Sequence, residues 1–334
     1  MRIIIDAMGG DNAPAEIVKG AVMAKQRLGV EVTLVGRAED VRACLENEGC
    51  TEIDIVDARE VISMADDPST ATRRKKDSSM AVALNLLREG KGDAVVSAGS
   101  TGALLTGATL TVKRIRGIRR AALAPVLPAG EHGVMLIDCG ANVECTAEYL
   151  LQFAYMGSFY AKKIMGCDSP RVGLLNVGTE DTKGGALQHQ AFALLKKAGE
   201  EGRINFIGNV EGTDVYAGKA DVVVTDGFTG NIYLKTVEGM GKFMKASLKK
   251  IFFRNIGTKI GAMFTMKGIK EISKQMDYRE TGGSPLLGTA KPVLKAHGSS
   301  DALAFKNAVR QAKDFVERNV IAEMEKVLSE NTEG

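Results

Sequence analysis

Cysteine and histidine are scarce in this chain, and their scarcity removes several kinds of chemistry. The 334 residues include five cysteines and three histidines. The cysteines are odd in number and show no CxxC spacing, which argues against a disulfide framework and against a zinc site. We therefore expect reduced thiols, no metal, no cofactor, and a mechanism that depends on other groups.

Long apolar segments are also missing. The chain opens directly on a strand-like run at 3–5, without an apolar leader that follows basic residues. The longest apolar candidate, 147–165, carries Glu148, Gln152, Lys162 and Lys163, which would be costly in hydrocarbon. We expect no integral membrane segment and a cytoplasmic protein.

The residues that are present indicate a large α/β domain. Hydrophobic residues make up 45% and charged residues 25% of the chain, which are ordinary globular values. Most expected strands are continuous apolar runs, as in parallel strands that are covered on both faces. The expected strands are 3–5, 32–35, 53–56, 94–97, 122–126, 134–137, 172–177, 204–207, 221–224 and 292–295. The expected helices are 14–28, 38–48, 78–89, 101–114, 146–165, 185–199, 230–253 and 299–328.

Short glycine-rich loops follow several of these strands. They are DAMGGD at 6–11, SAGSTG at 97–102, DCGAN at 138–142, NVG at 176–178 with KGG at 183–185, and DGFTGN at 226–231. Glycine lets the backbone approach a ligand closely, and the first N–H groups of a following helix have no intrahelical partner. Five such loops predict a phosphate-handling site along the carboxyl edge of a parallel sheet.

Positive charge is concentrated in one stretch. Residues 242–274 contain nine Lys or Arg and one acid, Glu271, interleaved with apolar side chains. The stretch carries +8 while the whole chain carries +3, which leaves −5 for the remainder. This asymmetry indicates an acidic partner or surface. We expect a basic amphipathic helical protrusion at about 242–274, bent at its glycines.

A second basic segment precedes the helix expected at 78–89. Residues 68–79 are polar and rich in hydroxyl groups, and they include Arg73, Arg74, Lys75 and Lys76. These side chains would reach an anionic ligand, with Arg73 and Lys76 as our candidates. The alternative is a solvated charge run.

Six motifs in series resemble a known family. They are IIIDAMGGDNAP, SAGSTGALL, DCGANVE, NVGTEDTKG, DGFTGN and AHGSSDA, in this order along nearly the whole chain. Together they are similar to the bacterial phosphate acyltransferases of phospholipid synthesis, the PlsX family. The resemblance implies a homodimer with a three-layer α/β/α fold, related to phosphotransacetylases and similar to the isocitrate and isopropylmalate dehydrogenases.

The resemblance also implies a reaction. A long-chain acyl group passes from acyl carrier protein to inorganic phosphate, and a membrane enzyme uses the acyl phosphate to acylate glycerol 3-phosphate. Functional coupling to that membrane enzyme and peripheral contact with the inner face of an anionic membrane are expected. No nucleic acid partner is expected.

The residues suit this chemistry on independent grounds. A thioester is already activated, because a thiol with a pKa of about 8.5 leaves readily, so no covalent enzyme intermediate is required. The enzyme must hold phosphate in line with the carbonyl, stabilise the oxyanion and exclude water. Backbone N–H groups, hydroxyls and one or two cations meet these needs.

Candidate phosphate ligands lie in the first two loops. Ser100, Thr101 and Gly102 begin a helix, where Ser100 and Thr101 either contact phosphate or only cap the helix. Asp6, Gly9, Gly10 and Asp11 are interpreted as structural or substrate-lining. Asn142 orients the nucleophile or donates to the carbonyl, although asparagine is also a common turn former.

Candidate catalytic residues lie farther along the chain. Lys183 either neutralises phosphate or stabilises the oxyanion, or it is an exposed lysine in a turn. Asp226 and Asn231 orient the nucleophile or donate to the carbonyl, although Asp and Asn are also common turn formers and helix N-caps. His297 is a candidate general acid toward the thiolate, against a structural role, and Cys139 and Cys145 are expected in the core.

The basic stretch has two readings. Apolar residues would enter the lipid headgroups while cations face anionic lipid, or the same residues would form a dimer interface and dock carrier protein. The candidate contacts are Phe252, Phe253, Arg254, Ile256, Lys259, Ile260 and Phe264.

Three other functions remain open. A phosphotransacetylase that uses coenzyme A thioesters would need the same chemistry. A dehydrogenase with bound metal and nicotinamide is disfavoured, because the first strand is not followed by GxGxxG and no acidic triplet lies on one helix. A non-catalytic adaptor that recruits carrier protein to the bilayer would leave the glycine loops unexplained.

Overall fold

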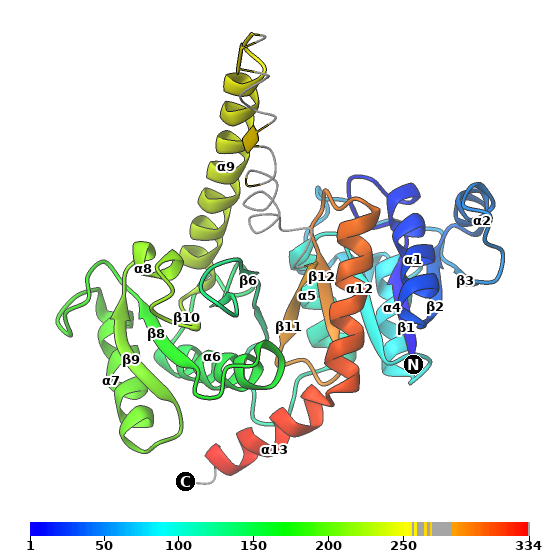
Figure 1. The fold of residues 1–334 in the computed structure, drawn as a ribbon. Coiled ribbons are helices and arrows are strands. Elements are labelled where there is room, and N and C mark those ends of the chain that lie inside the picture. The colour runs from blue at the N-terminus through cyan, green and yellow to red at the C-terminus, as the bar shows by residue number, and fades with distance from the viewer. Residues whose placement is uncertain (256, 259–263, 266–267, 269–281, 333–334) are drawn as a thin grey trace.

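The strands form two sheets. The computed structural model describes residues 1–255, 257–258, 264–265, 268 and 282–332. Ile256, Lys259 and Ile260 therefore lie outside the described residues. The seven-stranded sheet lies on one side of the molecule in Figure 1, and the five-stranded sheet on the other.

The seven-stranded sheet is mostly parallel, in the order β3-β2-β1-β4-β12-β11-β5. Strand β11 runs antiparallel to both of its neighbours. The strands are β1 Arg2–Asp6, β2 Glu31–Gly36, β3 Asp54–Asp57, β4 Ala94–Ser97, β5 Ala122–Leu123, β11 Gly283–Leu287 and β12 Val293–Ala296.

The five-stranded sheet has the order β6-β7-β10-β8-β9, and only β6 is antiparallel to its neighbour among these paired strands. Its strands are β6 Val126–Leu127, β7 Val134–Ile137, β8 Arg171–Leu175, β9 Asn205–Val210 and β10 Val222–Val224. The α/β class with mostly parallel strands is thus confirmed.

Helices cover the sheets. They are α1 Ala15–Leu28, α2 Ala38–Asn47, α3 Ala71–Arg74, α4 Ser79–Arg88, α5 Thr101–Gly107, α6 Ala147–Tyr160, α7 Ala186–Glu200, α8 Gly212–Tyr216, α9 Gly227–Phe252, α12 Ala302–Glu317 and α13 Val320–Thr332. The π-helical turns Ala108–Val112 and Ala161–Met165 continue α5 and α6. Among the described residues, none of the helices combines the length and apolar character needed to cross a bilayer.

Alternate residues of the central strands face opposite sides of the seven-stranded sheet. In β1, Ile3 and Ile5 join the core that Ile17 of α1 and Phe305 of α12 share, and these two helices lie side by side in Figure 1. Ile4 joins a second core with α4 and α5. Because side chains alternate along a strand, Asp6 follows Ile4 onto the α4 side.

Some elements differ from the sequence predictions, and α3, α8 and β11 were not predicted. The strand expected at 122–126 is divided, because β5 belongs to one sheet and β6 to the other. The helix expected at 299–328 is interrupted at Asn319, whose φ of 51° is left-handed. Strand β11 was not predicted, because its sequence GSPLL begins with residues typical of turns.

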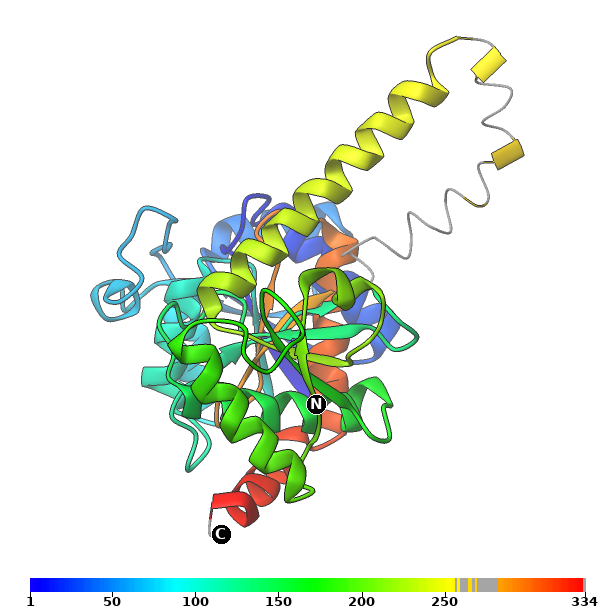
Figure 2. The same ribbon diagram turned by 90° about the vertical axis from the view of Figure 1, so that its left-hand side faces the viewer.

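Helix α9 projects away from both sheets, as Figures 1 and 2 show. Its base is held where the Tyr233 hydroxyl donates to the carbonyl of Gly212 at 2.8 Å. Farther out, Met240, Phe243, Met244 and Ile251 are between 46% and 66% exposed. Their spacing places them on one face of the helix. The turn expected beyond α9 falls largely outside the described residues.

Candidate functional site

Three polar side chains meet where β1, β4 and β12 end. Asp6 is 1%, Ser97 0% and Lys295 8% exposed. The Ser97 hydroxyl donates to Asp6 Oδ2 at 2.6 Å and accepts from the Gly99 N–H at 3.0 Å. Lys295 Nζ donates to the carbonyl of Ala98 at 3.2 Å and to that of Ala296. The cluster ties together the loops that follow β1, β4 and β12.

Burial opposes ionisation of both charged members. Burial raises the pKa of Asp6, and hydrogen bonds from the hydroxyls of Ser79 and Ser97 counteract the shift. Burial, helped by the charge of Lys235, lowers the pKa of Lys295 to about 8, while Asp6 and Asp11 oppose the change. A small change in surroundings is therefore enough to alter the charge of Lys295 near neutral pH.

The glycines of the first loop allow two loops to touch. A Cβ on Gly9 would lie 2.5 Å from Asp6 Oδ2 and 2.7 Å from the Gly99 nitrogen. Gly10 has a φ of +110°, which side chains rarely allow. The Asp11 N–H donates to the carbonyl of Gly298 at 2.8 Å. The structure thus brings Asp6, Gly9, Gly10 and Asp11 beside the ends of β4 and β12.

Ser100, Thr101 and Gly102 form the start of α5. Ser100 is 7% exposed, and its Oγ accepts from the Ala103 N–H at 3.5 Å, so it does cap the helix. Gly102 packs closely on the preceding basic segment, because a Cβ there would lie 2.8 Å from Pro68 Cβ. Thr101 is partly exposed. A hydroxyl that accepts one hydrogen bond can still donate its own proton.

His297 contacts two different elements. Its Nδ1 accepts from the Ser299 N–H at 3.2 Å and lies 2.9 Å from Ser299 Oγ. Its Nε2 lies 3.7 Å from Glu238 Oε2 on α9, and the Glu238 carboxylate also accepts from Lys235 Nζ at 2.8 Å. Partial burial alone would raise the pKa of Glu238, but His297 and Lys235 outweigh it and lower that pKa to about 2. Glu238 is therefore a carboxylate that joins α9 to the end of β12.

Asp138 and Asn142 form a second buried cluster at the end of β7. Asp138 accepts from the N–H groups of Leu123, Ala141 and Asn142 and from the Asn142 side-chain amide, at 2.6 to 3.2 Å. The same amide donates to the carbonyl of Ala121 at 2.8 Å. Burial raises the pKa of Asp138 to about 6 against these donors. Asn142 thus holds the DCGAN loop on the Asp138 carboxylate.

Asp226 and Asn231 lie at the start of α9. Asp226 caps the helix with both oxygens, which accept from the Thr229 N–H and hydroxyl at 2.8 Å. Gly227 touches the neighbouring loop, because a Cβ there would lie 2.5 Å from the carbonyl oxygen of Asn142. A Cβ on Gly140 would lie 3.4 Å from Asn231 Cγ. The Asp138 cluster and the start of α9 therefore form one packed unit.

Lys183 lies on a separate, exposed loop after β8. Asn176 holds this loop, because its side-chain amide donates to the carbonyl of Lys183 at 3.0 Å. The Lys183 stem covers Gly178, where a Cβ would lie 2.9 Å from Lys183 Cγ. The buried side chain of Asn209 donates to the carbonyl of Glu180 at 2.9 Å. Lys183 as a whole is exposed.

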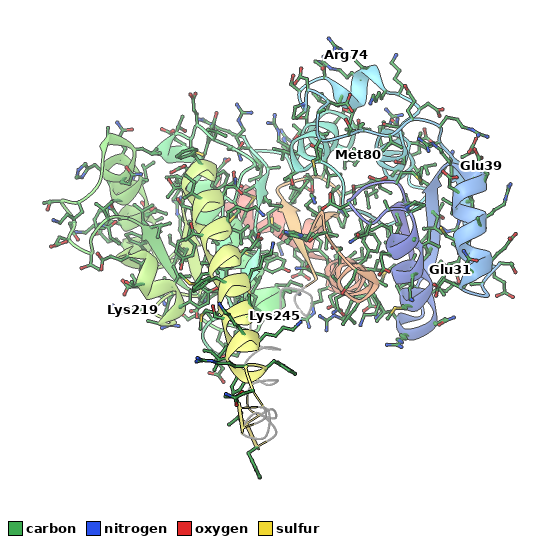
Figure 3. The ribbon with its side chains drawn as sticks, turned by 90° about the horizontal axis from the view of Figure 1, so that it is seen from above. Glu31, Glu39, Arg74, Met80, Lys219 and Lys245 are labelled. Carbon is green, nitrogen blue, oxygen red and sulfur yellow. The ribbon has the colours of Figure 1, made fainter. Side chains whose placement is uncertain are left out.

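In the basic segment 68–79, Lys75 contacts neighbouring residues, whereas other cations of the segment are exposed. Lys75 Nζ donates to Asp66 at 2.7 Å and to the carbonyl of Val61 at 2.9 Å. Arg73 and Lys76 are exposed, and Figure 3 shows Arg74 at the outer edge of the body.

The cysteines and possible metal ligands give no site. All five cysteines are free, and burial raises the pKa of Cys139 well above its usual value and that of Cys145 to about 11. Cys139 lies in the core, as predicted. No group of three or more His, Cys, Asp or Glu side chains in the described part of the chain could hold a metal ion.

Sequence reasoning did not select Ser97, Asp138, Glu238 or Lys295 as site residues, although Ser97 and Asp138 begin two of the glycine loops. A signal for Lys295 was present, because it stands two residues after Val293 in an expected strand and therefore shares the face of that core residue. Glu238 gave no such signal, since its partner His297 is far away in the sequence.

Comparison with known proteins shows close relatives. Residues 1–323 match the family described as fatty acid synthesis protein. The chain is 50% identical over 322 residues to the phosphate acyltransferase of Thermoanaerobacter pseudethanolicus, covering 96% of this chain and 95% of that protein. It is 45% identical over 333 residues to the phosphate acyltransferase of Clostridium acetobutylicum, covering 99% of each.

Solved structures show the same fold at low identity. The phosphotransacetylase of Streptococcus pyogenes superposes with a TM-score of 0.58 at 19% identity, covering 98% of this chain and 94% of that one. A branched-chain phosphotransacylase from Enterococcus faecalis gives 0.55 at 15% identity, covering 95% and 100%. The expected relation to the phosphotransacetylase fold is confirmed.

Proposed function

We propose that this chain, which belongs to the fatty acid synthesis protein family, takes a long-chain acyl group from acyl carrier protein and transfers it to inorganic phosphate. The chain is an acyltransferase, and phosphate is its acyl acceptor, as in its phosphate acyltransferase relatives. The carrier protein as acyl donor, the sites of binding and the cellular setting are our proposal.

The reaction needs no covalent enzyme intermediate. An oxygen of hydrogen phosphate attacks the thioester carbonyl carbon, and the carbon–sulfur bond breaks as the tetrahedral oxyanion collapses. The proton of hydrogen phosphate ends on the thiolate, so the products are an acyl phosphate dianion and a thiol. The protein must orient the two anionic reactants and stabilise the oxyanion.

The contact between the loops after β1 and β4 is the observation that supports this function best. Gly9 and Gly99 approach too closely for a side chain on Gly9, and Ser100 is buried directly beside them. Backbone N–H groups and hydroxyls at the carboxyl ends of parallel strands suit a phosphate group. We assign phosphate to this place, with the Ser100 and Thr101 hydroxyls as donors.

The remaining roles are assigned by position. Lys183, exposed on its loop, neutralises phosphate or the oxyanion. The contacts of Asp226 and Asn142 within their own loops favour a supporting role, in which they shape the start of α9. The Ser299 N–H on Nδ1 and Glu238 near Nε2 favour a positioning role for His297 over that of general acid.

Helix α9 provides the proposed contact with the membrane and the carrier protein. Its exposed apolar row consists of Met240, Phe243, Met244 and Ile251, and Phe253, which immediately follows the helix, is 59% exposed. Lys242, Lys245 and Lys249 are exposed, and their spacing places them on the opposite face; Figure 3 shows Lys245 on the projecting part. An apolar row beside cations suits an anionic lipid surface, and the lysines also suit an acidic carrier protein.

The proposed setting is a homodimer at the inner face of the cell membrane. The acyl phosphate product is an amphiphile, so release beside the bilayer keeps its apolar tail out of water. This position also supports coupling to a membrane enzyme that acylates glycerol 3-phosphate. Part of the apolar row of α9 would then belong to the dimer interface.

The function is tested with purified protein and acyl-acyl carrier protein. We expect thioester loss that requires phosphate, with an acyl phosphate that hydroxylamine converts to a hydroxamate. The same assay with long-chain acyl-coenzyme A identifies the donor, and higher kcat/KM for the coenzyme A thioester would favour the phosphotransacetylase alternative. Thioester binding without any phosphate-dependent turnover would favour the adaptor.

A further inference from the structure

We propose that Lys295 binds the phosphate substrate through its ammonium group, and that Asp6 and Ser97 are positioning residues that hold it in place. This inference rests on the proposed function and adds the residue that supplies positive charge. It concerns a buried lysine at the end of β12, separate from the exposed Lys183.

The three residues form one row across the sheet. Strands β1, β4 and β12 are adjacent and parallel, and their register pairs Asp6 with Ser97 and Ser97 with Lys295. Residues in register on neighbouring strands point to the same face. An acid, a hydroxyl and a base thus lie side by side at the carboxyl edge.

The residues two positions earlier on these three strands form an apolar row. Two residues earlier on the same strands come Ile4, Val95 and Val293, which are paired in register and lie in the core shared with α4 and α5. Core packing therefore ends where the polar row begins. Burying an acid and a base at that boundary carries a desolvation cost, because Asp6 and Lys295 are 1% and 8% exposed. Stability alone thus gives little reason to keep lysine here.

The hydrogen bonds of Lys295 point toward the phosphate position. An ammonium group has three protons, and carbonyl oxygens of Ala98 and Ala296 accept from Lys295 Nζ. Ala98 immediately precedes Gly99 and Ser100, and the Ser97 hydroxyl fixes the Gly99 N–H. The remaining ammonium proton is thus available beside the loop to which we assign phosphate.

The electrostatic surroundings suit a cation that meets an anion. Asp6 on β1 and Asp11 after it favour the charged form of Lys295, while burial and Lys235 on α9 disfavour it. Glu238 on α9 and His297 after β12 contact each other near the same strand end. A phosphate dianion would add two negative charges and raise the pKa of Lys295 on binding. Phosphate binding and protonation of Lys295 are therefore linked.

The test compares two lysines of the same segment. Lys295→Met removes the charge at the proposed site. Lys291→Met removes a lysine before β12 whose Nζ donates to the carbonyl of Leu87 at 2.6 Å, and it is the matched control. Equilibrium dialysis with radiolabelled inorganic phosphate gives the Kd without turnover. We expect Lys295→Met to raise the Kd at least about tenfold, because hydrogen bonds to charged groups contribute about 1.5–3 kcal/mol, and Lys291→Met to leave it near the wild-type value.

The pH dependence of the Kd separates charge from structure. Wild-type affinity for phosphate should fall as the pH rises above about 8, where the Lys295 ammonium deprotonates. Lys295→Arg keeps its charge and should retain affinity to higher pH. An unchanged Kd in Lys295→Met, or an identical alkaline loss in Lys295→Arg, would overturn the proposal.

A measurement on the wild-type protein covers the case in which Lys295→Met does not fold. Acetic anhydride labels deprotonated lysines, and mass spectrometry follows Lys295 and Lys291 separately. Phosphate should protect Lys295 and not Lys291, whereas equal labelling with and without phosphate would contradict the proposal. Acyl phosphate formation by the wild type is assayed independently, so a failure of the proposed function is distinguishable from a failure of this site.

Discussion

His297 Nε2 lies 3.7 Å from Glu238 Oε2 and thereby connects the end of β12 to the projecting helix α9. His297 directly follows β12 of the seven-stranded sheet, whereas α9 follows β10 of the five-stranded sheet. The Ser299 N–H donates to His297 Nδ1, so the neutral ring carries its proton on Nε2, toward Glu238. The contact couples the position of α9 to that of the β12 loop.

Glu238→Gln should destabilise the protein in a pH-dependent way. The folded-state pKa of Glu238 is about 2, below its usual value, so its contribution is present above about pH 4.5 and is lost as the pH falls toward 2. Urea unfolding at pH 7 should show a loss of about 1 kcal/mol relative to the wild type. Glu317→Gln, which breaks the exposed pair with Lys313 on α12, is the control. The difference in unfolding free energy between Glu238→Gln and the wild type should decrease as the pH falls toward 2. A difference that stayed constant would contradict a lowered pKa for Glu238.

Ser100→Ala should affect both stability and phosphate use. Ser100 caps α5, and Ser78 caps α4 by accepting from the Ala81 N–H at 3.3 Å, so each alanine variant should lose about 1 kcal/mol of unfolding free energy. Of these two capping variants, only Ser100→Ala should also raise the KM for phosphate, by about tenfold. Thr101→Ala should raise the KM for phosphate without a loss of stability, because Thr101 is not the cap. If Ser100→Ala and Ser78→Ala changed only stability, Ser100 would be a cap and nothing more.

Lys183→Ala should lower acyl phosphate formation by about 10²-fold, because a lost contact to a developing oxyanion typically has that effect. The melting temperature should stay near the wild-type value, since the side chain is exposed. Lys197→Ala on α7, whose side chain is 73% exposed, should change neither quantity. Near-normal kcat in Lys183→Ala would remove Lys183 from the mechanism.

Acidic residues on the apolar row of α9, or at Phe253 immediately after the helix, should release the protein from lipid. Phe243→Glu and Phe253→Glu should abolish flotation with vesicles that contain phosphatidylglycerol, because a carboxylate opposes both burial and anionic lipid. Ile207→Glu, at a 39% exposed position on β9, is the control. Retained dimer mass and activity toward acyl carrier protein in solution would support a membrane role. Monomerisation with unchanged flotation would assign the row to the dimer interface.

Chelation should leave the reaction intact. Direct attack by phosphate needs cations and N–H groups, and none of the described residues form a cluster of metal ligands. Turnover after exhaustive treatment with EDTA should equal that of the untreated protein. Loss of activity that magnesium restored would count against the direct-attack mechanism.

The sequence predicted the strands well where burial is uniform. The apolar residues of 94–96 and 134–137 are all buried in the structure, so local composition was a sufficient guide. The run at 122–126 is also apolar, but it contains Pro125, which has no N–H to donate to a strand ladder, and the strands on either side of it join different sheets. Pro125 is a local signal for the interruption, whereas the choice of sheet on each side of it depends on residues far away in the sequence.

The candidate site was predicted only in part, because some of its features are local in the sequence and others depend on long-range strand pairing. Glycine loops are visible in sequence because their backbone demands are local, and Gly9 and Gly10 do allow the close contact beside Asp6. The contacts of Lys295 depend on the adjacency of β4 and β12, which are almost two hundred residues apart. Such a pairing becomes apparent only when the topology is known.

The strand order has a consequence for synthesis on the ribosome. Strand β12 lies between β4 and β11, and β5 joins the sheet only through β11. Until residues 283–296 emerge, β4 has an unpaired edge and β5 has no neighbour in its sheet. Such an edge invites pairing with another chain, so the nascent protein is vulnerable to aggregation until its final sixth is made. The row of Asp6, Ser97 and Lys295 is completed when β12 pairs with β4. A chain shortened before β12 therefore lacks the strand that covers the β4 edge, and it also lacks Lys295, the proposed phosphate ligand.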